Sequence, residues 1–456
     1  MKIFNTLSGK KENFVPIEDN KIKMYVCGMT VYDDTHIGHA RTFLSFDLIV
    51  RYLRSINYEV NYIRNITDVD DKIISRAEEL RMTPKELTEK YIDSMNDDFQ
   101  SLGMIEPDSE PRATDNIDSI ISLIEILIQK GHAYEGDSDV YFSAKSFNSY
   151  GKLSRRNLED MLAGARVDID TDKKNPADFV LWKKNTDGMK WDSPWGEGRP
   201  GWHIECSAMS MDALGETFDI HGGGSDLKFP HHENEIAQSE CVTGKEFAKL
   251  WMHTGSLRID QEKMSKSLKN FVTIKGALEK HSAEVLRLFL ISSHYRSPLN
   301  YSEGALEEAK NSLDRLYNSL QDLIYEPKEY IQTEYSDKFH KAMQDDFNTP
   351  SALSVLFEMA RQINTLKKEN NSEESSALAK ELVTLSGILG LLQDNPVNHF
   401  TQGIDISEEE IESYIVKRNQ ARDQKDFDLS DKIRDELLEK GIILEDKESG
   451  TTWKKS

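Results

Sequence analysis

The spacing of apolar residues changes twice within the first seventy positions, and the change predicts a strand, a helix and a second strand. Residues 23–31 contain a continuous apolar run, which is typical of a buried strand. From about His39 the apolar residues recur at helical spacing, and residues 59–66 have the pattern of a second strand. This order favours a parallel crossover, in which ligands bind beyond the carboxyl ends of the strands.

The same patterns extend over the rest of the chain and predict an α/β protein. Residues from about 110 to 195 have the character of an insertion, after which the strand and helix patterns of the core resume. After about residue 301 the chain becomes helical and strongly charged. The further elements we expect are helices at 115–130 and 231–241, extended segments at 139–142, 216–220 and 253–260, and a helical hairpin with an extended tail within 405–456.

Composition excludes some classes of protein. A net charge of −23 argues against indiscriminate nucleic-acid binding, although local basic patches could still meet a nucleic acid. Three cysteines cannot form a disulfide framework, so a reducing cytosol is the default. The first residues lack the apolar run of a signal peptide, and the apolar stretch 120–128 is too short to span a bilayer. We therefore expect a cytoplasmic protein without a membrane partner.

Two short motifs supply groups that bind phosphate. His36-Ile37-Gly38-His39 lies between a predicted strand and helix, where free backbone N–H groups, the helix dipole and two imidazoles favour an anion. Lys263-Met264-Ser265-Lys266-Ser267 is a cationic loop that could close on a triphosphate and stabilise the charge of a leaving pyrophosphate. A capped helix with solvated histidines and an exposed lysine-rich loop are the alternatives for the two motifs.

A glycine-rich segment follows a predicted strand. Gly222, Gly223 and Gly224 would let a ligand approach the backbone, and Asp226 could accept a hydrogen bond from a ribose hydroxyl. A glycine-rich turn without a ligand is the alternative.

The metal-binding candidates are dispersed along the chain. His231 and Glu235 are four residues apart on a predicted helix and so share one face. Together with two thiolates they would satisfy zinc, but the spacing alone leaves buried free thiols as the alternative. The candidate ligands are Cys27, Cys206, His231 and Glu235, with His203, His221, His232 and Glu233 as rivals.

Several segments in a fixed order resemble the class I aminoacyl-tRNA synthetases and, among these, the cysteinyl-tRNA synthetase family. The similar segments are 24–33, 36–41, 65–71, 201–207, 219–226, 229–235 and 263–267, and the C-terminal segments 427–434 and 441–446 also resemble that family. The resemblance therefore extends over nearly the whole chain.

The resemblance implies a reaction, and roles for individual residues. Cysteine and Mg-ATP would form cysteinyl-adenylate and pyrophosphate, and the acyl group would then pass to the 3′ end of tRNA(Cys). One Zn²⁺ per chain would bind the substrate thiolate and so exclude serine, because a soft thiolate is a better zinc ligand than a hydroxyl. In this scheme Cys27, Cys206, His231 and Glu235 hold zinc; Gly28, Thr67 and Trp202 bind cysteine; His36, His39, Lys263 and Lys266 are catalytic; and His36, His39, Gly222, Gly223, Asp226 and Lys266 bind ATP.

The resemblance also implies an organisation into domains, and a monomer. The expected parts are a Rossmann-like catalytic domain in two halves (1–110 and 200–260), a connective insertion (111–199), a stem-contact region with the lysine-rich loop (261–300), a helical bundle (301–400) and a small anticodon-binding domain (401–456). A ligase that transfers cysteine to a small amino sugar is the nearest alternative, and a non-catalytic nucleotide-binding regulator is the second. The C-terminal segments favour tRNA over the amino sugar, and the intact motifs argue against the regulator.

Overall fold

The computed structural model describes residues 1–156, 172–184, 188–259, 262–263, 271–325, 332–401, 408–447 and 450–455. The chain forms two compact units. The first comprises Met1–Asn311, Gln332–Leu356 and Ile388–Leu391, and the second comprises Ser312–Ile331, Phe357–Gly387 and Leu392–Ser456. Within the described ranges, no helix combines the length and the apolar character needed to cross a membrane.

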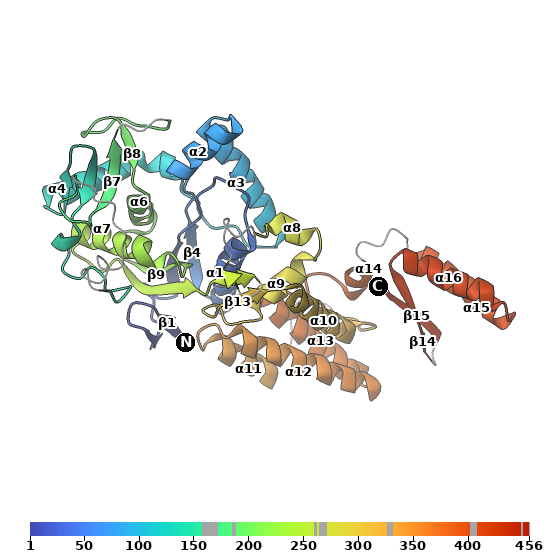
Figure 1. The fold of residues 1–456 in the computed structure, drawn as a ribbon. Helices are drawn as coiled ribbons and strands as arrows, with labels where there is room; N and C mark the ends of the chain where they lie inside the picture. The colour runs from blue at the N-terminus through green and yellow to red at the C-terminus, as the bar shows by residue number, and fades with distance from the viewer. Residues whose placement is uncertain are drawn as a thin grey trace. The chain divides into compact units, whose positions relative to one another are not determined.

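A four-stranded parallel sheet forms the centre of the first unit. Its strands are β3 (Lys21–Val26), β4 (Glu59–Arg64), β9 (Phe218–Gly224) and β10 (Ala248–Thr254), in the order β10-β9-β3-β4. Helix α1 (Ile37–Ser55) connects β3 to β4, so the predicted parallel crossover is confirmed (Figure 1). Because all four strands run in the same direction, the segments that follow them meet at one edge of the sheet.

The insertion carries a separate antiparallel sheet in the order β5-β6-β7-β8. Its elements are α4 (Ile117–Gln129), β5 (Ala133–Glu135), β6 (Asp139–Phe142), β7 (Phe179–Lys184) and β8 (Gly198–Pro200). Two helices of the catalytic half, α6 (Trp202–Leu214) and α7 (Glu233–Thr243), contribute to one apolar core with the central sheet and to another with the insertion. The helices α6 and α7 therefore join the two parts.

The remaining elements of the described residues are shorter connections in the first unit and a helical C-terminal region. They are β1 (Lys2–Asn5), β2 (Lys10–Asn13), α2 (Asp71–Leu80), α3 (Pro84–Ser101), η1 (Ala113–Asn116), η2 (Ala144–Ser146), η3 (Lys228–His232), β11 (Leu257–Ile259), β12 (Glu262–Lys263), α8 (Ile274–Leu278), α9 (Ala283–Ile291), β13 (Leu299–Tyr301), α10 (Glu303–Leu320), α11 (Glu334–Met343), α12 (Thr349–Lys368), α13 (Ser372–Ile388), α14 (Pro396–Thr401), α15 (Glu408–Asp423), α16 (Phe427–Glu439), β14 (Ile442–Lys447) and β15 (Gly450–Lys455).

Two strand predictions were wrong in their bounds. The segment 253–260 is not one strand, because β10 ends at Thr254 and β11 begins at Leu257. Between them the Gly255 N–H donates to the carbonyl oxygen of Tyr295 at 2.8 Å, which turns the chain away from the central sheet. The strand expected at 216–220 continues as β9 to Gly224, so the three glycines lie inside a strand rather than after it.

The last part of the second unit is the predicted helical hairpin with an extended tail. Helices α15 and α16 pack on the antiparallel pair β14–β15 through a small apolar core. Arg418 is buried and binds Asp446 through two contacts of 2.9 Å, and Arg422 binds the same carboxylate at 2.8 Å. These two arginines thus fasten the β-hairpin to α15.

Candidate active site and metal centre

The predicted ligand-binding segments meet at the carboxyl edge of the central sheet. The Cys27 N–H donates to the carbonyl oxygen of Gly222 at 3.0 Å, and the Gly28 N–H donates to Asn65 Oδ1 at 2.8 Å. The N–H of Thr67 donates to the carbonyl oxygen of Met29 at 3.2 Å. The segments after β3 and β4 therefore continue side by side beyond the strands, at the carboxyl edge of the sheet.

His36 and His39 form a stacked pair at the N-terminus of α1. The His36 Nδ1 accepts the N–H of His39 at 3.2 Å, and the His39 Nδ1 accepts the N–H of His36 at 3.4 Å. Their ring centroids lie 3.6 Å apart with 17° between the planes. Because each Nδ1 accepts a backbone N–H, the ring proton of a neutral imidazole belongs on Nε2, where it could be donated to an anion. Both histidines are part of the helix cap, and both remain partly exposed.

The segment that leaves the lysine-rich loop pairs with the segment that enters α1. The N–H of Ile37 donates to the carbonyl oxygen of Val272 at 3.1 Å, and the N–H of Ile274 donates to that of Thr35 at 3.0 Å. On the other side of the loop, the backbone of Lys263 belongs to β12. Lys266 and the Lys263 side chain lie outside the described residues. The two motifs, far apart in the sequence, therefore have neighbouring flanks in the fold.

Four buried side chains converge behind this edge. Glu235 Oε1 lies 3.4 Å from the Sγ of Cys27 and 3.1 Å from the Nε2 of His231. The ligand atoms of Cys27, Cys206, His231 and Glu235 all lie within 4.8 Å of one another. Two sulfurs, one imidazole nitrogen and one carboxylate are a donor set that zinc accepts. The four ligands expected from the sequence resemblance are therefore brought together.

A second donor set overlaps the first. Cys27, His221, His232 and Glu235 also place their ligand atoms within 4.8 Å of one another. His221 Nε2, however, is hydrogen bonded to Glu235 Oε2 at 2.7 Å, and its ring stacks on Trp251 at 4.4 Å between centroids. The first set offers two soft thiols instead of one. The imidazole of the first set, His231, is also oriented by a second histidine, because its Nδ1 lies 3.0 Å from the Nδ1 of His203.

The electrostatics of the cluster suit a cation. Burial raises the pKa of Cys27 well above its ordinary value, and the neighbouring Cys206 and Glu235 add to the shift. Burial also raises the pKa of the Cys206 thiol. For Glu235 burial acts in the same direction, but His221 and His231 hold its pKa below the ordinary value. A bound divalent ion would stabilise both thiolates and the carboxylate, since a coordinating thiol loses its proton.

Two further residues of the predicted pocket, Trp202 and Thr67, are linked to the cluster through its neighbours. Trp202, the first residue of α6, is 36% exposed, and its ring centroid lies 4.2 Å from that of His231. Thr67 is buried, and its Oγ1 receives a hydrogen bond from Asn65 Nδ2 at 3.3 Å. Trp202 thus contacts the cluster through His231, and Thr67 is linked to it through Asn65, whose Oδ1 lies 3.7 Å from the Sγ of Cys206.

The glycines of β9 lack space for side chains. A Cβ on Gly222 would lie 2.3 Å from the Phe46 ring of α1, and one on Gly223 would lie 2.9 Å from the ring of His232. A Cβ on Gly224 would lie 2.4 Å from the carboxylate of Asp226. Packing against Phe46 thus requires glycine at position 222 whether or not a ligand binds. Glycine at position 224 lets the Asp226 carboxylate approach the end of the strand.

Sequence reasoning missed two residues of the site. Asn65 contacts both Gly28 and Thr67, and His253 at the end of β10 bonds through Nε2 to His232 Nδ1 at 2.9 Å. Burial lowers the pKa of His253 to about 3, so its ring is neutral near pH 7. Both residues could have been found from the rule that the carboxyl ends of parallel strands share one edge, because each lies at or directly after such an end.

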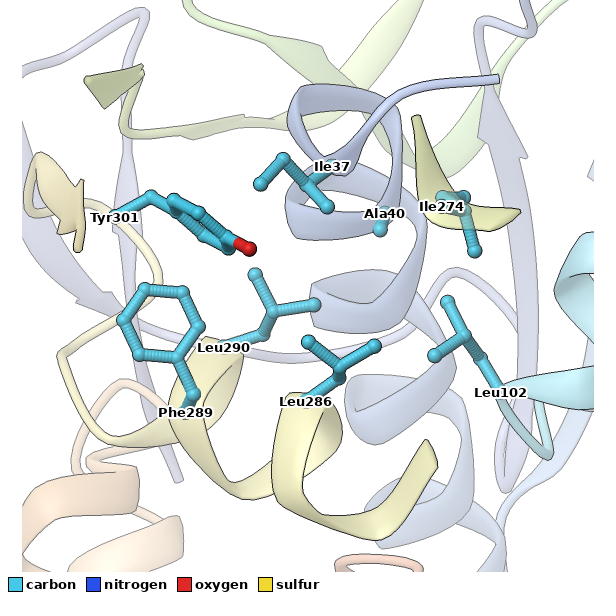
Figure 2. A pocket seen from close by; sticks show the side chains of 8 residues that line it. All are labelled: Ile37, Ala40, Leu102, Ile274, Leu286, Phe289, Leu290 and Tyr301. Atoms are coloured by element: carbon cyan, nitrogen blue, oxygen red, sulfur yellow. The ribbon is translucent and has the colours of Figure 1, made fainter. Parts of the chain in front are cut away.

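A small cavity lies on the other side of the His36–His39 helix (Figure 2). Figure 2 shows apolar side chains of α1 and α9 pointing into it, among them Ile37, Ala40 and Leu286. It leaves no room for a water molecule, and seven of the eight residues that line it are apolar. The cavity therefore belongs to the packing of α1 on α9 and is not part of the active site.

Comparisons with known proteins agree with this geometry. Residues 13–311 match the model of the tRNA synthetases class I (C) catalytic domain, and residues 338–393 match the DALR domain. A solved methionyl-tRNA synthetase from Mycobacterium tuberculosis superimposes with a TM-score of 0.60 at 14% identity, covering 81% of this chain and 89% of that chain. At that identity the likeness concerns the fold alone. Fold and site together define a class I aminoacyl-tRNA synthetase.

Curated relatives narrow the class. A cysteine–tRNA ligase from Hahella chejuensis is 54% identical over 467 residues, with 100% of both chains covered. One from Haemophilus influenzae is 54% identical over 458 residues, again with 100% of both covered. The chain belongs to the cysteine–tRNA ligase family.

Proposed function

We propose that this chain is a cysteine–tRNA ligase, which activates L-cysteine with ATP and transfers the cysteinyl group to tRNA(Cys). The observation that carries the proposal is the buried group of Cys27, Cys206, His231 and Glu235, together with the stacked His36–His39 pair at the N-terminus of α1. The buried group would hold a metal that binds the substrate thiol, and the two histidines would supply donors for phosphate. The full-length identity to cysteine–tRNA ligases supports the same conclusion.

In the proposed activation step, the protein acts by positioning and electrostatics. The Nε2–H groups of His36 and His39 would donate to ATP phosphate oxygens at the positive end of α1. Lys263 and Lys266 would stabilise the charge that develops as pyrophosphate leaves. Asp226 would accept a ribose hydroxyl, with Gly222 and Gly223 beneath the nucleotide. The roles of these residues rest on the family resemblance, and the stacked histidine pair supports them.

We propose that Cys27, Cys206, His231 and Glu235 hold one Zn²⁺ per chain. When bound, zinc would ligate the thiolate of substrate cysteine and so disfavour serine. Gly28, Thr67 and Trp202 would line the pocket. Gly28 has a steric requirement of its own, because a Cβ there would lie 1.7 Å from the carbonyl oxygen of Asn65.

For the tRNA we propose the domain roles expected from the sequence. The catalytic halves (1–110 and 200–260) would hold the adenylate, and 111–199 would be a connective insertion between them. The regions 261–300 and 301–400 would contact the stem, and 401–456 would read the anticodon. Arg418 and Arg422 already bind Asp446, which favours a structural role for this pair over base recognition. We also propose that the protein is cytoplasmic and monomeric.

The alternative acceptor, a small amino sugar, finds no support among the relatives, since eight of them at 52–54% identity are all cysteine–tRNA ligases. The experiment that tests activation is the exchange of labelled pyrophosphate into ATP. We expect exchange that depends on cysteine and is absent with serine. Cysteine-independent exchange, or none at all, would contradict the proposal.

A further inference from the structure

Asp71 is a contact point between the catalytic half and the insertion. It is the first residue of α2 and follows the pocket residue Thr67 by four positions. Its Oδ2 lies 2.9 Å from Lys183 Nζ, and its Oδ1 binds Arg199 Nη2. One carboxylate at the edge of the catalytic sheet therefore binds two cations from the insertion.

The two cations are direct neighbours on the insertion sheet. Lys183 of β7 pairs with Arg199 of β8 in the antiparallel register. Like charges directly opposite each other destabilise a strand pair, so the pair needs an anion. Asp71 supplies this anion. Burial alone would raise the pKa of Asp71, but Lys183 and Arg199 hold that pKa below the ordinary value.

Arg199 is the buried member of this group. It is only 4% exposed, whereas the side chain of Asp71 is 66% exposed. A second carboxyl group, that of Glu205, is fully buried, and burial raises its pKa well above the ordinary value, which favours the neutral acid. A buried guanidinium is costly unless it is paired, so the position of Arg199 is strongly determined by the carboxylate of Asp71.

A short rigid segment connects Arg199 to Trp202. The Gly201 N–H donates to the carbonyl oxygen of Leu181 at 2.8 Å, and a Cβ on Gly201 would lie 2.2 Å from the carbonyl oxygen of Val180. The segment therefore moves with β7. Trp202 follows directly as the first residue of α6, so the place of its ring depends on where the insertion sheet is held.

Thr67 is connected to Asp71 as well. The two residues belong to one segment, in which the Thr67 N–H donates to the carbonyl oxygen of Met29 at 3.2 Å and the Thr67 carbonyl oxygen accepts the N–H of Val31 at 3.2 Å. This segment is fixed on the catalytic side, while Trp202 closely follows β8 of the insertion sheet. The ion pair between Asp71 and Arg199 connects the segment of Thr67 to the segment of Trp202.

We propose that Asp71 is a positioning residue for the amino-acid pocket, whose bridge to Arg199 sets the separation between Thr67 and Trp202. The inference rests on the proposed function, because it takes these two residues as the walls around substrate cysteine. Loss of the bridge lets the insertion sheet shift and widens the pocket for a small amino acid. ATP binding is unaffected, since the histidine pair sits at the N-terminus of α1, whereas the ion pairs of Asp71 are with Lys183 and Arg199 of the insertion sheet.

The variant Asp71→Asn keeps the shape of the side chain and removes its charge, at a position exposed enough to tolerate the change. In cysteine-dependent pyrophosphate exchange we expect KM for cysteine to rise about 5- to 30-fold, the factor for a loss of one to two kcal/mol. KM for ATP and the zinc content should stay at the wild-type values. Asp71→Glu, which keeps the carboxylate, should recover most of the affinity for cysteine.

The matched control is Glu135→Gln. It removes the partner of Lys184, the next residue of β7, which binds Glu135 at 2.8 Å within the insertion itself. This bridge has a similar exposure, 52% for the Glu135 side chain, but does not reach the catalytic half. KM for cysteine should stay unchanged in this variant. Lys183→Gln, which removes the more exposed arm of the Asp71 contact, should raise it by a smaller factor than Asp71→Asn.

The outcomes separate the two proposals. Wild-type protein without cysteine-dependent exchange would overturn the proposed function, and this inference with it. Normal wild-type exchange together with an unchanged KM for cysteine in Asp71→Asn would overturn the inference alone. Equal rises in KM for cysteine and for ATP, or an equal effect of Glu135→Gln, would also overturn it, because either result indicates a general structural disturbance.

Discussion

The variant Cys206→Ser distinguishes the two overlapping donor sets of the buried cluster. Cys206 belongs only to the set with two thiols, and His232 belongs only to the set with two imidazoles. A serine hydroxyl stays protonated and is a poor zinc ligand, so the first set would keep three donors. His232→Gln would leave all four donors of that set in place.

The magnitude follows from the position of each residue. Loss of an outer-shell partner of a metal site costs about 10- to 100-fold in affinity, and loss of a ligand should cost more. For Cys206→Ser we therefore expect more than about a 100-fold loss, or more than about 2.7 kcal/mol. His232 Nε2 lies 3.9 Å from Glu235 Oε1, and its replacement should cost no more than an outer-shell change.

The assay is zinc per chain after dialysis against a competing chelator, measured by elemental analysis on both variants and the wild type. We expect about one zinc in the wild type and in His232→Gln, and almost none in Cys206→Ser. Retention of zinc by Cys206→Ser, together with its loss from His232→Gln, would refute the argument and move the metal to the second set.

Three further predictions concern the scaffold around the site. Asp47→Asn should lower the free energy of unfolding by about 3–5 kcal/mol, because it leaves the buried guanidinium of Arg287 without its carboxylate, and the exposed control Glu216→Gln should change it by less than about 1 kcal/mol in the same urea titration. Gly28→Ala places a Cβ 1.7 Å from a backbone oxygen of the neighbouring segment, so KM for cysteine in pyrophosphate exchange should rise by about tenfold or more, and a normal KM would contradict the tight approach. Burial lowers the pKa of His253 to about 3 from 6.5, so between these two pH values the unfolded chain binds a proton that the folded chain does not. This group should therefore lower the free energy of unfolding by about 1.4 kcal/mol for each pH unit as the pH drops from 6.5 towards 3. Unfolding titrations of His253→Gln should show a shallower dependence on pH than those of the wild type.

Local patterns were sufficient for the elements that carry the site. The periodicity after His39 and the strand patterns on either side predict the right order of strand, helix and strand, because these signals depend on neighbours a few residues apart. Because the carboxyl ends of parallel strands share one edge, the same order predicts that the segments after the two strands, with Cys27, His36 and Thr67, meet there. The structure confirms that placement.

Interactions between distant segments could not be predicted in the same way. Asp71 lies 112 residues from Lys183 and 128 from Arg199, and no local pattern connects them. The inclusion of Gly222–Gly224 in β9 also ran against propensity, because glycine is depleted in strands. The requirement at Gly222 and Gly223 comes from the rings of Phe46 in α1 and His232 in η3. Such features depend on packing that exists only after the chain has folded.

Transfer of labelled cysteine to total tRNA in the presence of ATP and Mg²⁺, with serine as the control, tests the central claim most directly. The wild-type protein should charge tRNA with cysteine and leave serine unused, because a zinc-bound thiolate is what the buried cluster would recognise. Charging with both amino acids would contradict the metal-based selectivity. An absence of charging alongside intact cysteine-dependent pyrophosphate exchange would contradict the assignment of tRNA as the acceptor.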